Sequence, residues 1–363
     1  MKIKKFFPAF IIKLFKALLF VLQKEKQKYF KGKEKLLFRK IYEQIIWLLK
    51  ENNYNSMYYM YGLHLKGSYL SNYIGKKEFN KLLTDKEKKF INIPKKKNCY
   101  LLNLATTDKF YVTSILKSNE ISVIDNIALI NNGKLIKPKG KLENINSLFS
   151  LSFPMIIKNT ILEYNEGLYF LNNEGNDFFL NGYKKEKENI NLLFSSGSWV
   201  IQKPFESSQD IKKINHTALN TTRIYTIMRN GNPFFLGGYQ AFATEKSKTD
   251  SWGKKSIYVG FDKFNNCLSD KGFYHPHFRK KFVYFHPDSK IKFKGYKINY
   301  LNEAIELCKK AHRLFYYTYI IGWDVAITDS GPKILELNDR PGVNALQAIN
   351  GGIKKVISNP TIR

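Results

Sequence analysis

The chain has 363 residues, of which 44% are hydrophobic, so it is long enough for two or three subdomains with a substantial core. Its 60 Lys and Arg residues exceed its 30 Asp and Glu residues, which leaves a formal net charge of +30. Because the lysines are scattered and arginine is scarce, this charge does not predict specific nucleic-acid binding, whereas it favours anionic small-molecule substrates.

The three cysteines, Cys99, Cys267 and Cys308, are far apart and form no Cys-x-x-Cys motif. Their spacing argues against a disulfide framework and a thiolate metal site, and it fits a reducing cytoplasm. His275 and His277 follow Cys267, but this spacing matches no usual zinc pattern, so we predict no zinc site.

Residues 1–84 are predicted to form a helical N-terminal region. It starts with a basic cluster and an apolar run over residues 6–22, in which Lys13 and Lys16 share one edge of a helix. The first forty residues contain thirteen Lys or Arg and two Glu. The run is too short and charged for a membrane span, and no signal-peptide cleavage site follows it. Two alternatives stay open: the helix lies on the anionic inner face of a membrane, or it packs on the protein's own core.

Residues 85–363 are predicted to form a second unit of mixed strands and helices. Apolar runs predict strands at 99–105, 121–130, 153–159, 167–173 and 198–205. Helical spacing predicts helices at 106–119, where Thr107 is a plausible N-cap, and at 209–215 and 302–318. An Asn-Gly pair predicts the turn of a hairpin over 221–244. This order has no regular βαβ alternation, so the predicted fold class is α+β.

The last predicted hairpin, residues 322–342, carries three polar residues in otherwise apolar strands. Asp324 lies in its first strand, and Glu336 and Asn338 lie two residues apart in its second, on one face. In any register that pairs residues of equal parity, Asp324 shares that face. Two carboxylates that converge would repel each other unless a cation binds, and Mg²⁺ prefers carboxylate and amide oxygens. The alternative is a half-exposed hairpin whose polar face contacts water.

Three cations upstream of this hairpin extend the pattern. Lys109 lies in the predicted helix at 106–119, Lys158 ends a predicted strand, and Arg223 begins another. Each lysine alone is more simply a solvated surface residue, but with a metal-binding hairpin the three would form a clamp for a polyphosphate. The segment WVIQKPF could supply the backbone against which a purine ring lies. No Walker A or G-x-G-x-x-G motif is present, so P-loop and Rossmann folds are not predicted.

The order of these segments resembles the ATP-grasp superfamily, and most closely its sugar-transfer-associated branch, found among bacterial surface-polysaccharide genes. The resemblance covers roughly residues 60–355 and rests on IIK, WVIQKPF, LNTTRIYTI, FHPDSKIKFKGYKI and IGWDVAITDSGPKILELNDRPG. It implies an ATP-grasp fold of two α+β lobes, approximately 85–200 and 201–363, that grip ATP. The implied site consists of the Mg²⁺ ligands Asp324, Glu336 and Asn338, the phosphate contacts Lys109 and Lys158, the adenine hinge Gln202, Lys203 and Phe205, the phosphoryl contact Arg223, and Arg340 facing the acyl phosphate.

Two segments depart from the family's pattern. After Lys158, where relatives carry a glycine-rich loop over the phosphates, KNTILEYNEGLYF offers only Gly167. Further along, TDSWGKKSIYVGFD replaces the usual Asp-Asn and Gly-Gly pattern. A loop with fewer glycines offers fewer free backbone N–H groups to a triphosphate, which affects turnover more than the fold.

The resemblance implies an ATP- and Mg²⁺-dependent carboxylate–amine ligase that acts through an acyl phosphate. The implied substrates are a uronic acid or amino sugar on a nucleotide or lipid carrier, together with an amine or amino acid. Two alternatives stay open: an ATP-grasp kinase that phosphorylates a sugar hydroxyl, and a non-catalytic basic protein that binds a membrane or nucleic acid.

Overall fold

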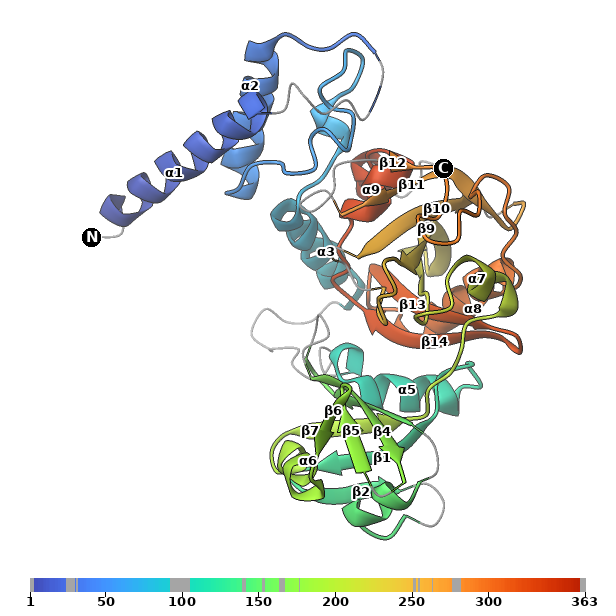
Figure 1. Cartoon of the computed structure of the whole chain (residues 1–363). Helices are drawn as coiled ribbons and strands as arrows, with labels where there is room; N and C mark the ends of the chain where they lie inside the picture. Colours follow the sequence, from blue (N-terminus) through green and yellow to red (C-terminus); the bar gives the residue numbers. More distant parts are fainter. Residues whose placement is uncertain are drawn as a thin grey trace.

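A computed structural model describes residues 3–23, 30, 32–91, 105–138, 142–151, 154–162, 167–175, 177–250, 253, 255–262, 264–275 and 282–359. In this part of the chain, two seven-stranded antiparallel sheets are accompanied by helices, and a helical region precedes them (Figure 1). The predicted α+β class and the helical N-terminal extension are therefore confirmed.

The first sheet lies at the bottom of Figure 1 and is formed by residues 126–202. Its elements are β1 (Asn126–Asn131), β2 (Lys134–Pro138), η3 (Ile145–Ser150), β3 (Met155–Asn159), β4 (Leu168–Glu174), β5 (Asp177–Leu180), β6 (Tyr183–Lys185), α6 (Lys187–Phe194) and β7 (Ser198–Gln202), and its strand order is β2-β1-β7-β3-β4-β5-β6. Ile157 and Ile201 point into a core that η3 and α6 cover. Because side chains alternate along a strand, Lys158 and Gln202 lie on the opposite face.

The second sheet has the strand order β12-β11-β10-β9-β8-β13-β14. Its elements are α7 (Gln209–Ile214), β8 (Thr222–Arg229), β9 (Asn232–Ala243), β10 (Ser256–Asp262), β11 (Cys267–Tyr274), β12 (Phe282–Val283), α8 (Leu301–His312), η4 (Arg313–Phe315), β13 (Ile320–Thr328), β14 (Gly331–Asn338), α9 (Asn344–Asn350) and α10 (Lys354–Ser358). Both faces are buried: Ile224 packs with α7 and α8, whereas Tyr225 packs with α9, α10 and residues 57–83.

The N-terminal region comprises α1 (Ile3–Leu22), α2 (Leu37–Glu51), η2 (Leu70–Asn72) and α3 (Lys76–Ile91). The start of α3 is capped by Glu51 of α2, whose carboxylate accepts the N–H groups of Lys77 and Glu78 at 2.7 and 3.0 Å. A Cβ on Gly75 would lie 2.1 Å from Cδ of Glu51, so a larger residue here would displace the capping carboxylate. None of the described helices, α1 included, has the length and apolarity of a membrane span.

Helix α5 (Lys109–Ser118) contacts both β1 and β14 and so lies between the two sheets. Asp108 is its N-cap, since its carboxylate accepts the N–H groups of Phe110 and Tyr111 at 2.9 and 3.1 Å. The prediction of Thr107 as the N-cap is therefore wrong by one residue. The predicted strand at 99–105 falls on residues 92–104, which lie outside the described residues, and on Ala105, which is helical.

The predicted boundaries at residues 84 and 200 fall inside α3 and β7. We therefore propose to divide the lobes where the elements end, with the first lobe beginning at α5 and the second in the connection 203–208 that follows β7.

Candidate active site

A β-bulge in β14 places the polar residues of the last hairpin on one face of the second sheet. Near the turn, Val325 pairs with Ile334, but one step further Asp324 pairs with Glu336. Leu335 is thus an extra residue in β14. Without it, Asp324 would stand opposite Leu335, and Glu336 would point to the other face. The bulge therefore creates the convergence of the two carboxylates.

Asp324 and Glu336 belong to a polar row that crosses four neighbouring strands. Arg223 of β8 stands opposite Asp324, and Tyr239 of β9 stands opposite Arg223. Nη2 of Arg223 donates to Oδ2 of Asp324 at 2.9 Å, and its Nε lies 2.5 Å from Oδ1. The side chains of Arg223 and Asp324 are only 19% and 18% exposed, so this ion pair is largely shielded from water.

The polar row, Tyr239, Arg223, Asp324 and Glu336, favours additional positive charge. Burial raises the pKa of Asp324, the charge of Arg223 opposes this rise, and the charge of Glu336 adds to it. Burial alone would lower the pKa of Arg223, but the charge of Asp324 raises that pKa above its ordinary value. Arg223 is thus a permanent cation, and a further cation beside the two carboxylates would relieve their mutual repulsion.

Two lysines of the first lobe approach the row. Nζ of Lys109, at the start of α5, lies 3.7 Å from Oε1 of Glu336. Burial lowers the pKa of Lys158 in β3; the carboxylates of Glu336 and Asp324 raise it, and the charge of Lys109 lowers it. The structure therefore brings both predicted phosphate-binding lysines to the predicted metal-binding carboxylates, from opposite lobes.

Asn338 stands opposite Gly322, one step along the same face from the row. A Cβ on Gly322 would lie 2.7 Å from Cβ of Pro341 and 3.2 Å from Nη1 of Arg223, so glycine allows both to approach. Nδ2 of Asn338 is buried and has no hydrogen-bond partner among the described residues. The ligand that Asn338 could offer is its amide oxygen, and two carboxylates with an amide oxygen are the donor types that a hard dication such as Mg²⁺ prefers. In the described part of the chain, no cluster of three or more His, Cys, Asp and Glu offers an alternative.

The predicted adenine hinge lies where the chain passes between the lobes. Nε2 of Gln202 donates to Oδ1 of Asn126 at 2.8 Å, which fixes the orientation of the amide. Its Oε1 is buried and has no donor among the described residues. Lys203, which is exposed, and Phe205, which is half-buried, follow in the connection after β7. A buried oxygen that lacks a donor matches the amino group of adenine, so the hinge remains a prediction with a chemical basis.

The connection after Lys158 uses its backbone N–H groups internally. Oδ1 of Asn159 accepts the N–H groups of Ile161 and Leu162 at 3.1 and 3.2 Å. The carbonyl oxygen of Leu162 accepts a hydrogen bond of 2.6 Å from Nζ of Lys109. These two N–H groups are therefore engaged before a phosphate arrives, and residues 163–166 lie outside the described residues.

Arg340 is bound by a carboxylate of the N-terminal region. Its Nη1 and Nη2 donate to the two carboxylate oxygens of Glu87 in α3 at 2.8 and 2.5 Å. Glu87 also accepts the N–H of Tyr319 at 3.1 Å, so it links the N-terminal region to β13 and to the end of β14. No sequence signal could reveal this pair, because Glu87 and Arg340 are 253 residues apart.

Sequence reasoning missed two further residues near the row. Tyr239 completes the row on β9, and Oδ2 of Asp250, in the connection between β9 and β10, accepts the N–H of Thr221. Burial raises the pKa of Asp250 to about 6, and the charge of Asp324 contributes to this rise. The Asn-Gly turn predicts the β8–β9 hairpin, but a bulge between Tyr225 and Thr226 shifts its register, so counting from the turn misplaces Tyr239.

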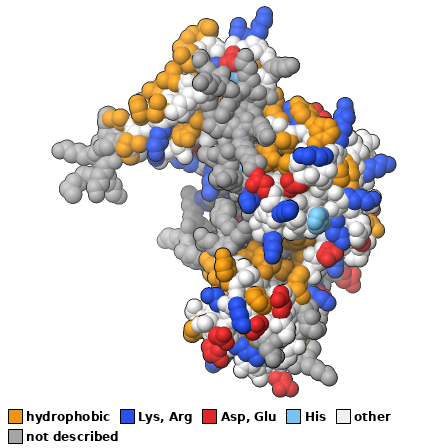
Figure 2. Space-filling view, viewed as in Figure 1, with side chains coloured by type: hydrophobic (Ala, Val, Ile, Leu, Met, Phe, Trp, Pro, Cys, Tyr) orange, Lys and Arg blue, Asp and Glu red, His pale blue; other side chains and the backbone are white. Residues whose placement is uncertain are grey.

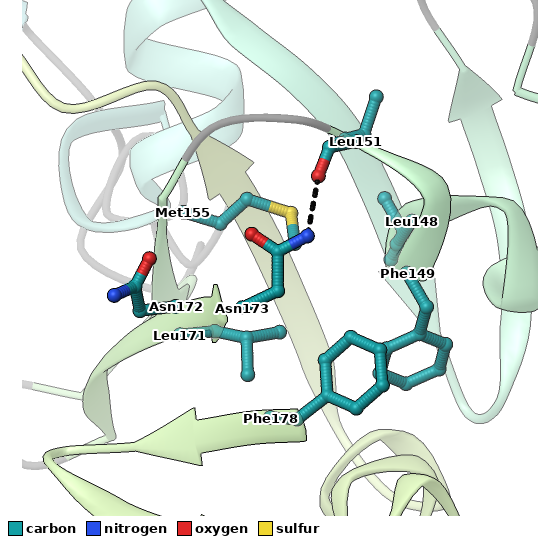
Figure 3. Close-up of a pocket in the computed structure, with 8 residues that line it drawn as sticks. All are labelled: Leu148, Phe149, Leu151, Met155, Leu171, Asn172, Asn173 and Phe178. Carbon is teal, nitrogen blue, oxygen red and sulfur yellow. Dashed lines mark hydrogen bonds between the residues drawn. The ribbon is translucent and has the colours of Figure 1, made fainter. Parts of the chain in front are cut away.

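A small apolar depression lies elsewhere, within the first lobe (Figure 3). It is lined by Leu148, Phe149, Leu151, Met155, Leu171, Asn172, Asn173 and Phe178, and Nδ2 of Asn173 donates to the carbonyl oxygen of Leu151 at 3.1 Å. None of the predicted site residues lines it, so it is a feature of the lobe's core and separate from the polar row.

The geometry above agrees with a family assignment. Residues 90–359 match the protein family described as sugar-transfer associated ATP-grasp. The chain belongs to this family. The resemblance predicted from the sequence and the ATP-grasp fold are thereby confirmed. No curated protein matches the chain.

Solved structures with a similar fold include three ATP-grasp relatives at low identity. They are an N5-carboxyaminoimidazole ribonucleotide synthetase in its ADP complex (12% identity, TM-score 0.40, 67% of this chain and 51% of that chain), a D-alanine–D-alanine ligase from Bacillus anthracis (16%, 0.38, 71% and 67%) and an L-amino acid ligase from Bacillus licheniformis (12%, 0.39, 71% and 46%). The matched region thus spans about half the length of the first of these proteins.

Proposed function

We propose that the protein is an ATP- and Mg²⁺-dependent carboxylate–amine ligase that acts through an acyl phosphate. The observation that carries this proposal is the convergence of Lys109 and Lys158 from one lobe on Asp324 and Glu336 from the other. Such an arrangement of cations and metal-binding carboxylates is what a transferring phosphoryl group requires.

Each part of the site has a role in this proposal. Asp324, Glu336 and Asn338 would hold Mg²⁺, which when bound neutralises phosphate oxygens. Lys109 and Lys158 would bind the phosphate oxygens from the side of the first lobe. Arg223, kept charged and fixed by Asp324, would stabilise the negative charge of the transferring phosphoryl group. The hinge at Gln202, Lys203 and Phe205 would hold the adenine.

The proposed ligase reaction has two steps. A carboxylate oxygen of the substrate attacks the γ-phosphorus and displaces ADP, which gives an acyl phosphate. The nitrogen of an amine then attacks the acyl carbon, phosphate leaves, and the nitrogen loses a proton to give an amide. In this proposal Arg340 would face the acyl phosphate only after it leaves Glu87, since both of its Nη atoms are bound there.

The family's association with sugar transfer supports a sugar substrate. We propose a uronic acid or an amino sugar on a nucleotide or lipid carrier, modified with an amine or amino acid during surface-polysaccharide biosynthesis. A cytoplasmic location is part of this proposal: the demand for ATP supports it, as do the free thiols of Cys267 and Cys308 among the described residues.

A screen for ADP release tests the proposed reaction. Purified protein is incubated with MgATP and pairs of candidate substrates drawn from uronic acids, amino sugars, amino acids and amines. The masses of the products are measured by mass spectrometry. We expect ADP release only with a carboxylate and an amine together, and a product lighter by one water than the sum of the two. A phosphate ester formed from a sugar alone would show a kinase instead, and no ADP release with any pair would contradict catalysis of this class.

A further inference from the structure

Helix α1 is held firmly on one side. Ala17 and Val21 are buried, and the ring of Phe20 lies 5.0 Å from that of Tyr54 and 5.7 Å from that of Tyr59. Nζ of Lys13 donates to Oδ1 of Asn52 at the end of α2 at 3.1 Å. These contacts fix the rotation of α1 about its axis, and therefore also the side that it turns to solvent.

The opposite side of α1 is apolar and exposed. Ile11, Ile12, Phe15 and Leu22 are 53%, 55%, 60% and 54% exposed, and we call them the α1 apolar face. At about 100° per residue, Ile11, Phe15 and Leu22 fall within about 40° of one another on the helix. Single exposed apolar residues are ordinary on a protein surface, but three large ones that are aligned, with Ile12 beside them, mark a contact surface.

The charges around this face favour an anionic partner. Helix α1 contains no acidic residue, and the exposed Lys16 follows Ile12 by one turn, at the margin of the α1 apolar face. The first forty residues of the chain contain thirteen Lys or Arg and two Glu. Large apolar side chains with a lysine at their margin match a bilayer surface with anionic lipids, where the ring and alkyl chains insert and the ammonium group meets headgroups.

The position of α1 permits this contact. In Figure 1 the helix projects from the rest of the molecule, away from both sheets, and in Figure 2 hydrophobic side chains run along it towards α2. Helix α1 therefore lies apart from both lobes (Figure 1), and its exposed side chains remain accessible. Because α1 lacks the length and apolarity of a membrane span, contact in the plane of the interface is the geometry that remains for it.

We propose that α1 docks the protein on an anionic membrane surface, with Ile11, Ile12, Phe15 and Leu22 inserted among the headgroups and Lys16 bound to lipid phosphate. The sequence left two alternatives for this segment, contact with a membrane or packing on the protein. In this proposal both apply, because one side of α1 packs on the protein while the other contacts the membrane. The proposal does not depend on the ligase reaction, because it rests only on the surface of α1.

Co-sedimentation with lipid vesicles tests this docking. The full-length protein is mixed with vesicles of phosphatidylcholine alone or of phosphatidylcholine with phosphatidylglycerol. We expect binding only to the mixed vesicles, weakened by added salt. Combined substitution Ile11→Gln, Phe15→Gln and Leu22→Gln should reduce the partition coefficient about tenfold or more, because three inserted side chains are lost. Lys16→Glu should also weaken binding, by about fivefold or more.

A matched control uses equally exposed apolar residues elsewhere. Tyr183, Leu192 and Phe264 are 73%, 67% and 81% exposed and lie outside the N-terminal region. Their combined replacement by glutamine should leave vesicle binding unchanged. The proposal is overturned if the wild type ignores anionic vesicles or binds neutral ones equally well, or if the control variant loses as much binding. It is also overturned if sedimentation velocity shows a dimer that only the α1 substitutions dissociate, because the face would then serve a second copy.

Discussion

Glu336→Gln is expected to reduce MgATP turnover by on the order of 100- to 1,000-fold, as removal of one group that stabilises a transferring charge does. The substitution keeps the shape of the side chain but removes its negative charge, and Glu336 faces Asp324 and Lys109. The fold should survive, because Glu336 is about one-third exposed on the edge strand β14. The measurement is kcat and KM for ADP release, together with a urea unfolding curve.

Glu206→Gln is the matched control for this substitution. Glu206 lies in the connection after β7, and its side chain is 80% exposed. Its Oε2 lies 2.8 Å from Nζ of Lys212. We expect its replacement to change turnover less than about twofold, as for an exposed ion pair. If Glu336→Gln retained turnover within a few-fold of the wild type, the carboxylates of the polar row would not be the metal ligands.

The second large effect concerns stability. Arg223→Gln is expected to lower the free energy of unfolding by about 2–4 kcal/mol, because the shielded carboxylate of Asp324 then loses its partner. In the double variant Arg223→Gln/Asp324→Asn no uncompensated charge remains, so most of the lost stability should return. Urea unfolding of all four proteins, without nucleotide or metal, measures this coupling.

Additive effects in this double-mutant cycle would contradict the structure, since they would mean that Arg223 and Asp324 do not interact. Lys212→Gln is the control, because the pair of Lys212 with Glu206 is solvent-exposed and should contribute less than about 1 kcal/mol. Catalytic activity should remain low in both Arg223 variants, because the cation itself is missing even where stability has returned.

The sequence predicted which strands carry the residues of the proposed site better than it predicted how those residues are paired. The polar intruders Asp324, Glu336 and Asn338 and the family's segment order identified the hairpin, and strand alternation correctly put Glu336 and Asn338 on one face. The turn itself sets a register in which Asp324 would face Leu335, and only the bulge brings Glu336 opposite. A bulge adds one residue without a distinct sequence mark, so counting from a turn cannot locate it.

Long-range contacts explain the remaining differences. Arg340 was predicted to face the acyl phosphate, and in the structure it forms an ion pair with Glu87 of α3. Local sequence patterns cannot predict this contact, because it depends on how the N-terminal region packs against the second sheet. Similarly, amphipathic spacing predicted helix α1 but not which of its sides would be buried. The buried side is set by the contacts of Phe20 with Tyr54 and Tyr59, which follow helix α2 in the chain.

Binding of ATP with and without Mg²⁺ tests the central claim most directly. Calorimetric titration of the purified protein with a non-hydrolysable ATP analogue in excess Mg²⁺ should show one site, and Lys158→Met should weaken that site about tenfold or more. Replacing Mg²⁺ by EDTA should weaken binding to a similar or greater extent, because Asp324 and Glu336 would then face the phosphates without a dication. Equal affinity with Mg²⁺ and with EDTA, or no nucleotide binding at all, would contradict the assignment of the polar row as the floor of an ATP site.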